Sequence, residues 1–280
     1  MSEMNFARFH GVVPKFQNYA AVAEQNILYI TPEANAMPRR YDPFEDSEGL
    51  LLDVVRAGAA VTGCDAFMDY CLSHKMLPLR DMEFWRYGDF FATSPKEAQP
   101  LVDTLLAFVR RYGLPAWEQN GITTTYPARY EQRAMAVRQD DDDNTDYLLH
   151  YEIVRRACAS AGAVPACTLA LMLLNFYLQF IEGIDAGYFP IRNAEWALDF
   201  GHKKAPELIV QVSDLTTCIN LAYAQLVSGE GKAIRQCKHC QKFFVAEDLR
   251  AEYCSPRCRG AYNSKMTRKR VKERKLREGQ

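Results

Sequence analysis

The sequence lacks the patterns that mark common enzymes, secreted scaffolds and repeat proteins. It has no HExxH motif, no nucleophile elbow, no Rossmann glycine pattern and no repeat at a solenoid period. Nine cysteines in 280 residues are too few for a small disulfide scaffold. The first sixteen residues have neither an apolar run nor a small-residue cleavage site, so we expect no secretory signal. These absences predict a cytoplasmic protein that is not an enzyme, in which paired cysteines are metal ligands.

One uncharged apolar stretch, residues 161–181, raises the question of a membrane span. A helix from Pro165 to Glu182 would be about 25 Å long at 1.5 Å per residue. The hydrocarbon core of a bilayer is ~30 Å thick. We therefore expect a buried core helix here and no membrane partner.

The first 229 residues have the pattern of one mostly helical domain of unknown role, with a few short strands. Apolar residues recur at helical spacing in several segments, and Ser or Pro stands at several of the starts. We predict helices over residues 94–112, 147–161, 165–182 and 213–228, and strands over residues 27–31, 122–126 and 208–212. The expected fold class is therefore mainly α.

Charge divides the chain into two parts. Residues 232–280 carry 15 lysines and arginines against 5 acidic residues, a net charge of +10, whereas the preceding 231 residues have a net charge of −11. The glycine-containing segment 228–232 is typical of a flexible linker, so we divide the chain into domains 1–229 and 230–280. A basic module beside an acidic body is typical of a protein that binds a polyanion.

The basic part contains two cysteine pairs with the spacing of zinc ligands. Two residues separate Cys237 from Cys240, which fits a tight turn around one ion, and thirteen residues follow before Cys254. Cys254 and Cys258 are four positions apart, the spacing of one helix face, and Ser255 and Pro256 between them are helix-start signals. The sequence therefore predicts one structural Zn²⁺ held by four thiolates in a treble-clef arrangement of knuckle, hairpin and ligand-bearing helix.

The other cysteines and the histidines carry no comparable signal. We expect His239 to be a non-ligand that points away from the ion. The remaining cysteines have no paired spacing and are expected to be small buried hydrophobes: Cys64, Cys71, Cys158, Cys167 and Cys218.

The cysteine region resembles a known family of zinc fingers. The two cysteine pairs, together with Phe243-Phe244, Arg250, Tyr253 and the basic helix that follows, resemble the zinc finger of the CGNR type. This resemblance implies a bacterial DNA-binding regulator whose finger follows a larger, mostly helical domain. The sequence departs from the family signature after Cys258, where it reads Arg-Gly-Ala-Tyr-Asn in place of Gly-Asn-Arg.

The last helix carries the cations that we expect to contact the phosphates of a nucleic acid. We expect this nucleic acid to be DNA, and RNA is the alternative, since Tyr253 and Tyr262 could stack bases. Beyond Met266 the cations point in every direction, so this segment has no apolar face to bury and projects into water. If about five phosphates are neutralised, the logarithm of the affinity falls with the logarithm of the salt concentration at a slope of about −4.5. The expected contacts are Arg257, Arg259, Lys265, Arg268, Lys269, Arg270 and Lys272.

The sequence leaves other functions open beside DNA binding and transcription regulation. The module could instead dock an acidic partner protein, and the first domain could hold an unknown small ligand or protein. A nuclease-like enzyme is disfavoured, because residues 241–280 contain no histidine and the four histidines of the first domain stand alone.

Overall fold

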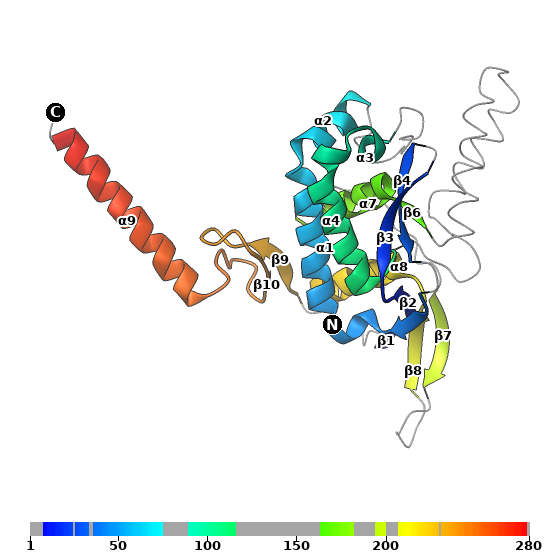
Figure 1. Cartoon of the computed structure of the whole chain (residues 1–280). Coiled ribbons are helices and arrows are strands. Elements are labelled where there is room, and N and C mark those ends of the chain that lie inside the picture. The colour runs from blue at the N-terminus through cyan, green and yellow to red at the C-terminus, as the bar shows by residue number, and fades with distance from the viewer. Residues whose placement is uncertain are drawn as a thin grey trace, which may run out of the picture. The chain divides into compact units, whose positions relative to one another are not determined.

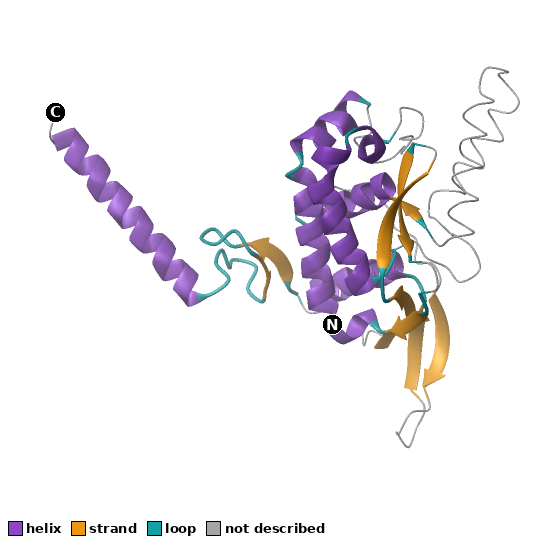
Figure 2. Ribbon diagram, viewed as in Figure 1, coloured by secondary structure: helices purple, strands orange, loops and turns teal. Residues whose placement is uncertain are grey.

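The computed structural model describes residues 8–24, 26–33, 36–74, 89–115, 163–181, 194–199, 207–229 and 231–278. Of these residues 56% are helical and 24% are in strands, which form four sheets (Figure 2). The fold is mixed α/β, so the expectation of a mainly α protein is wrong. Short strands such as β1 (Arg8–Gly11) escape a periodicity argument because four residues are too few to show alternation.

The chain divides into two compact units, Met1–Ala222 and Tyr223–Gln280 (Figure 1). The boundary predicted from charge and glycine content lies a little later in the chain, between residues 229 and 230. Among the described residues, the first unit contains three of the sheets and most of the helices, and the second contains the end of the helix Leu215–Ala224, the π-helical turn Gln225–Gly229, one hairpin and the C-terminal helix.

Three helices form the core of the first unit: α1 (Ser47–Thr62), α4 (Pro95–Tyr112) and α7 (Ala166–Phe180). The backbones of α1 and α7 approach closely at Gly58, where an added Cβ would lie 2.4 Å from the carbonyl oxygen of Leu173. Most side chains of α7 are buried, which confirms it as a core helix. Within the described residues, no helix has the length and apolar character needed to cross a bilayer.

The sheets of the first unit join distant parts of the chain. In the first sheet, β8 (Glu207–Val212) is the central strand. It pairs parallel with β1 and antiparallel with β7 (Ala194–Asp199). The second sheet has the order β3 (Tyr19–Glu24), β4 (Ile27–Pro32) and β6 (Val164–Pro165). The third pairs β2 (Val13–Phe16) with β5 (Pro38–Tyr41). The remaining short elements of this unit are η1 (Pro43–Asp46), α2 (Asp65–Ser73) and α3 (Phe90–Thr93).

Asp89 ties α3 to the second sheet. Its side chain is fully buried and accepts hydrogen bonds from the backbone N–H of Leu28 at 2.7 Å and of Phe91 at 3.2 Å. Burial raises the pKa of Asp89 to about 6, and the two hydrogen bonds only partly oppose this effect.

Most predicted segments that the structure describes are confirmed. The helices over 94–112 and 165–182 are α4 and α7, and the strands over 27–31 and 208–212 are β4 and β8. The helix over 213–228 is α8 (Leu215–Ala224), which continues as the π-helical turn η4 (Gln225–Gly229). The predicted helix 147–161 and strand 122–126 lie outside the described residues.

Candidate metal centre

A short hairpin positions the first cysteine pair. Strands β9 (Ala233–Gln236) and β10 (Phe243–Ala246) pair antiparallel, with Gln236 opposite Phe243. The turn between them closes through two hydrogen bonds of 2.9 Å, from Cys237 N–H to Lys242 O and from Gln241 N–H to Cys237 O. Gln241 adopts a positive φ of 59°, which turns the chain back into β10. Cys237 and Cys240 are therefore presented from one tight knuckle.

The loop after β10 is fastened to this knuckle. The backbone N–H of Lys238 donates to the carbonyl oxygen of Glu252 at 3.0 Å, and the two side chains form an ion pair. Hydrogen bonds from Arg250, through its guanidinium and its backbone N–H, lower the pKa of the Asp248 carboxyl at the loop tip. These contacts bring Cys254 back beside the first pair.

The second cysteine pair spans the start of α9 (Pro256–Glu278). Ser255 caps this helix, because its hydroxyl accepts from Cys258 N–H at 3.2 Å and its carbonyl accepts from Arg259 N–H at 3.1 Å. Pro256 occupies the first helical position, where its missing N–H costs nothing. The cap was predicted from the same two residues, and it fixes Cys258 in the first turn.

The four predicted ligands meet at one point. The sulfur atoms of Cys237, Cys240, Cys254 and Cys258 all lie within 4.8 Å of one another. The Sγ atoms of Cys240 and Cys254 are 3.7 Å apart, and those of Cys254 and Cys258 are 3.5 Å apart. A tetrahedron with metal–sulfur bonds of about 2.3 Å has edges of about 3.8 Å. The four cysteines could therefore bind one metal ion with little movement.

The surroundings of the cluster affect its thiols unequally. Cys237 is buried, which opposes ionisation, but backbone N–H groups of the knuckle donate to its sulfur and lower the pKa of Cys237 to about 6. The thiol of Cys254 is exposed to solvent, and hydrogen bonding with Cys258 raises the pKa of Cys254 to about 12. Cys237 is thus better prepared than Cys254 to act as a thiolate ligand.

In the part of the chain that the structure describes, the other cysteines and the histidines lie outside this cluster. His239 is exposed and is not among the clustered ligands. Cys71, Cys167 and Cys218 are buried, which confirms the expectation of small buried side chains, whereas Cys64 is only half-buried. Cys158 lies outside the described residues.

All seven cations expected to contact nucleic acid lie on α9 and are exposed. Half-buried side chains recur every four residues near its start, at Cys258, Tyr262 and Met266, so this line of the helix faces the rest of the second unit. Lys269 continues that line approximately and pairs with Glu273, with 3.8 Å between Nζ and Oε1. The other six cations lie on the remaining circumference.

Two features of this region go beyond the predicted site residues. The cations Lys275 and Arg277 are as exposed as the expected contacts. The high lysine and arginine content of the tail is the sequence feature that would have indicated them. The rings of Tyr253 and Tyr262 contact each other; helical spacing puts Tyr262 on the face of the helix that packs on the finger, but it does not identify Tyr253 as the partner. Comparison with known protein-family models, curated proteins and solved structures gave no match. The resemblance to the CGNR finger thus stays a prediction from these residues.

Proposed function

We propose that the second unit is a structural zinc module that binds DNA, and that the chain is a bacterial cytoplasmic transcription regulator. The observation that carries the zinc proposal is the convergence of four sulfur atoms within 4.8 Å. Thiolates are soft ligands that suit Zn²⁺, and four of them fill its tetrahedral coordination. No position is then left for a catalytic water, so the ion has a structural role.

The DNA proposal rests on α9, the helix whose first turn contains the fourth cysteine, Cys258. Its cations are exposed, and Zn²⁺ bound at Cys258 would hold the first turn rigid. Lysine and arginine side chains bind phosphates, and a helix presents them at regular intervals along a duplex. The regulatory role comes from the resemblance to CGNR-type proteins.

Metal analysis tests the zinc proposal directly. Protein purified without chelators should contain one zinc ion per chain, measured by inductively coupled plasma mass spectrometry together with thiol titration. Four reactive thiols without bound metal in this module would falsify the proposal.

Deletion of residues 264–280 tests the DNA proposal. The deletion keeps all four cysteines and the first turn of α9 but removes most of its cations. We expect normal zinc content and loss of DNA binding in a mobility-shift assay. Unchanged DNA binding would show that the cations of residues 264–280 are not the DNA contacts, and absence of DNA binding by the intact chain would instead favour docking of an acidic partner protein by the module.

A further inference from the structure

We infer that α9 enters the major groove of duplex DNA with the face opposite Cys258, Tyr262 and Met266. This inference rests on the proposed DNA-binding function and assigns the orientation and the form of the nucleic acid. It starts from the distribution of charge around the helix at 3.6 residues per turn. The half-buried line of three residues marks the inner side of the helix, and the cations of α9 sort relative to that line.

The cations form two rows on the two flanks of the helix. One row is made of lysines and arginines together: Arg257, Lys265, Arg268, Lys272 and Lys275. The other row contains arginine at every cationic position: Arg259, Arg270, Arg274 and Arg277. Lys269 belongs to neither row, because it lies on the inner side and pairs with Glu273.

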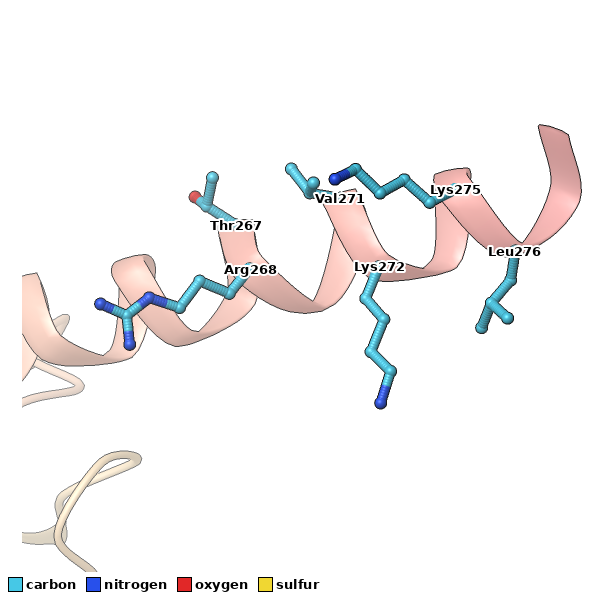
Figure 3. A pocket seen from close by; sticks show the side chains of 6 residues that line it. All are labelled: Thr267, Arg268, Val271, Lys272, Lys275 and Leu276. Atoms are coloured by element: carbon cyan, nitrogen blue, oxygen red, sulfur yellow. The ribbon is translucent and has the colours of Figure 1, made fainter. Parts of the chain in front are cut away.

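The outer face between the rows carries uncharged side chains over most of its length. Its positions Ser264, Thr267 and Val271 are all exposed. Figure 3 shows Thr267 and Val271 pointing to the same side of α9, whereas Leu276 points to the opposite side. The side chain of Lys275 lies along the helix beside Val271, so a cation borders this face.

Two cationic rows on opposite flanks match a ligand with phosphates on both sides. The major groove of B-DNA is about 12 Å wide and admits one α-helix of about 10–12 Å diameter. A helix lying in it has one phosphate backbone on each side, within reach of lysine and arginine side chains. The 23 residues of α9 span about 35 Å, which is about one turn of the duplex. A double-stranded RNA has a major groove too narrow for a helix, and a single strand offers one backbone.

A matched pair of substitutions tests which face enters the groove. Val271 and Leu276 are both exposed apolar residues of the same helix, 49% and 64% exposed, but they lie on different sides. Val271→Trp adds bulk to the outer face and should weaken binding of a mixed-sequence DNA duplex of about 30 base pairs by roughly tenfold. Leu276→Trp should change the affinity by less than about twofold, because it adds bulk on the side of α9 opposite Val271, away from the face that enters the groove. Affinities are measured by fluorescence anisotropy on the zinc-loaded full chain.

The same assay with other probes separates this inference from the proposed function. The wild type should prefer the DNA duplex to the corresponding single strand and to duplex RNA. Equal effects of the two tryptophans, or preference for single-stranded DNA or RNA, overturn the groove assignment but leave nucleic-acid binding in place. A wild type that binds none of the three probes overturns both.

Discussion

The rings of Tyr253 and Tyr262 pack against each other, with centroids 5.4 Å apart and planes inclined by 53°. Tyr253 directly precedes the third cysteine of the cluster, and Tyr262 lies one turn of α9 beyond the fourth. This contact joins the metal loop to the helix independently of the sulfur atoms. It therefore fixes the direction in which α9 leaves the module.

Replacement of Tyr262 by alanine should loosen this joint. Aromatic pairs contribute about 0.5–1.5 kcal/mol beyond the area that they bury. We expect Tyr262→Ala to keep one bound zinc ion but to weaken DNA binding, because α9 is then less well oriented. Zinc content and anisotropy on the same sample check this, and Tyr262→Phe should behave as the wild type. Loss of zinc in the alanine variant would contradict the separation of the two roles.

Removal of one ligand should unfold the metal module. Cys237→Ser takes away the buried ligand and should release zinc, because the apparent free energy of zinc binding supplies most of the stability of so small a unit, about 10–16 kcal/mol in isolated fingers. Amide signals of residues 233–262 in a two-dimensional NMR spectrum report the loss of fold. Cys64→Ser, at a half-buried cysteine of the first unit, is the control and should retain one zinc ion.

Neighbouring cations of α9 should contribute unequally to DNA binding. Arg270→Ala removes a cation of the arginine row and should make the slope of log affinity against log salt less steep by about 0.9. Lys269→Ala should leave the slope nearly unchanged, since Lys269 pairs with Glu273 on the inner side. Equal changes in slope for both variants would show that charge number alone determines binding.

The close approach of α1 and α7 should not tolerate a larger side chain at Gly58. An added Cβ would lie 2.4 Å from a backbone oxygen of α7, so the helices must separate. We expect Gly58→Ala to lower the free energy of unfolding of the first unit by about 1–3 kcal/mol, measured by urea denaturation. Gly260→Ala is the counterpart in α9, where an added Cβ meets nothing within 4 Å. That variant should stabilise its helix by up to about 1 kcal/mol.

Asp89 should give the first unit a pH-dependent stability. Burial raises its pKa from 3.8 to about 6, so the folded state holds this proton more tightly than the unfolded chain does. The resulting stability is fully present below pH 3.8 and is lost as the pH rises through about 6. The difference in unfolding free energy between wild type and Asp89→Asn, which does not titrate, should therefore fall over this interval. Parallel stability curves for the two proteins would contradict it.

The four-cysteine site was predictable from sequence because its information is local. Two short cysteine spacings and the Ser255-Pro256 helix start lie within 22 residues. Each spacing by itself indicates a pair of metal ligands, and the Ser-Pro sequence by itself indicates the start of a helix. The long helices α4 and α7 were predictable for a similar reason, since many apolar positions sample the helical period.

The mixed α/β character of the first unit was not predictable in this way. Strand β1 pairs with β8, about 200 residues away in the sequence. Strand β4 pairs with β6, about 135 residues away. A strand of two to four residues is too short to show an alternating pattern and depends on the partner strand with which it pairs. Such a strand is therefore identified from the folded structure and not from its own residues.

The sequence alone determined the ligand set, the start of α9 and the surplus of positive charge, because each depends on residues that are neighbours in the chain. Helical spacing also places Cys258 and Tyr262 on the side of α9 that packs on the finger, but only the tertiary structure decided that Tyr253 is the partner of Tyr262 there and that Met266 extends this side. Packing energy depends on contacts between side chains, and those contacts exist only after the hairpin, the loop and the helix have come together.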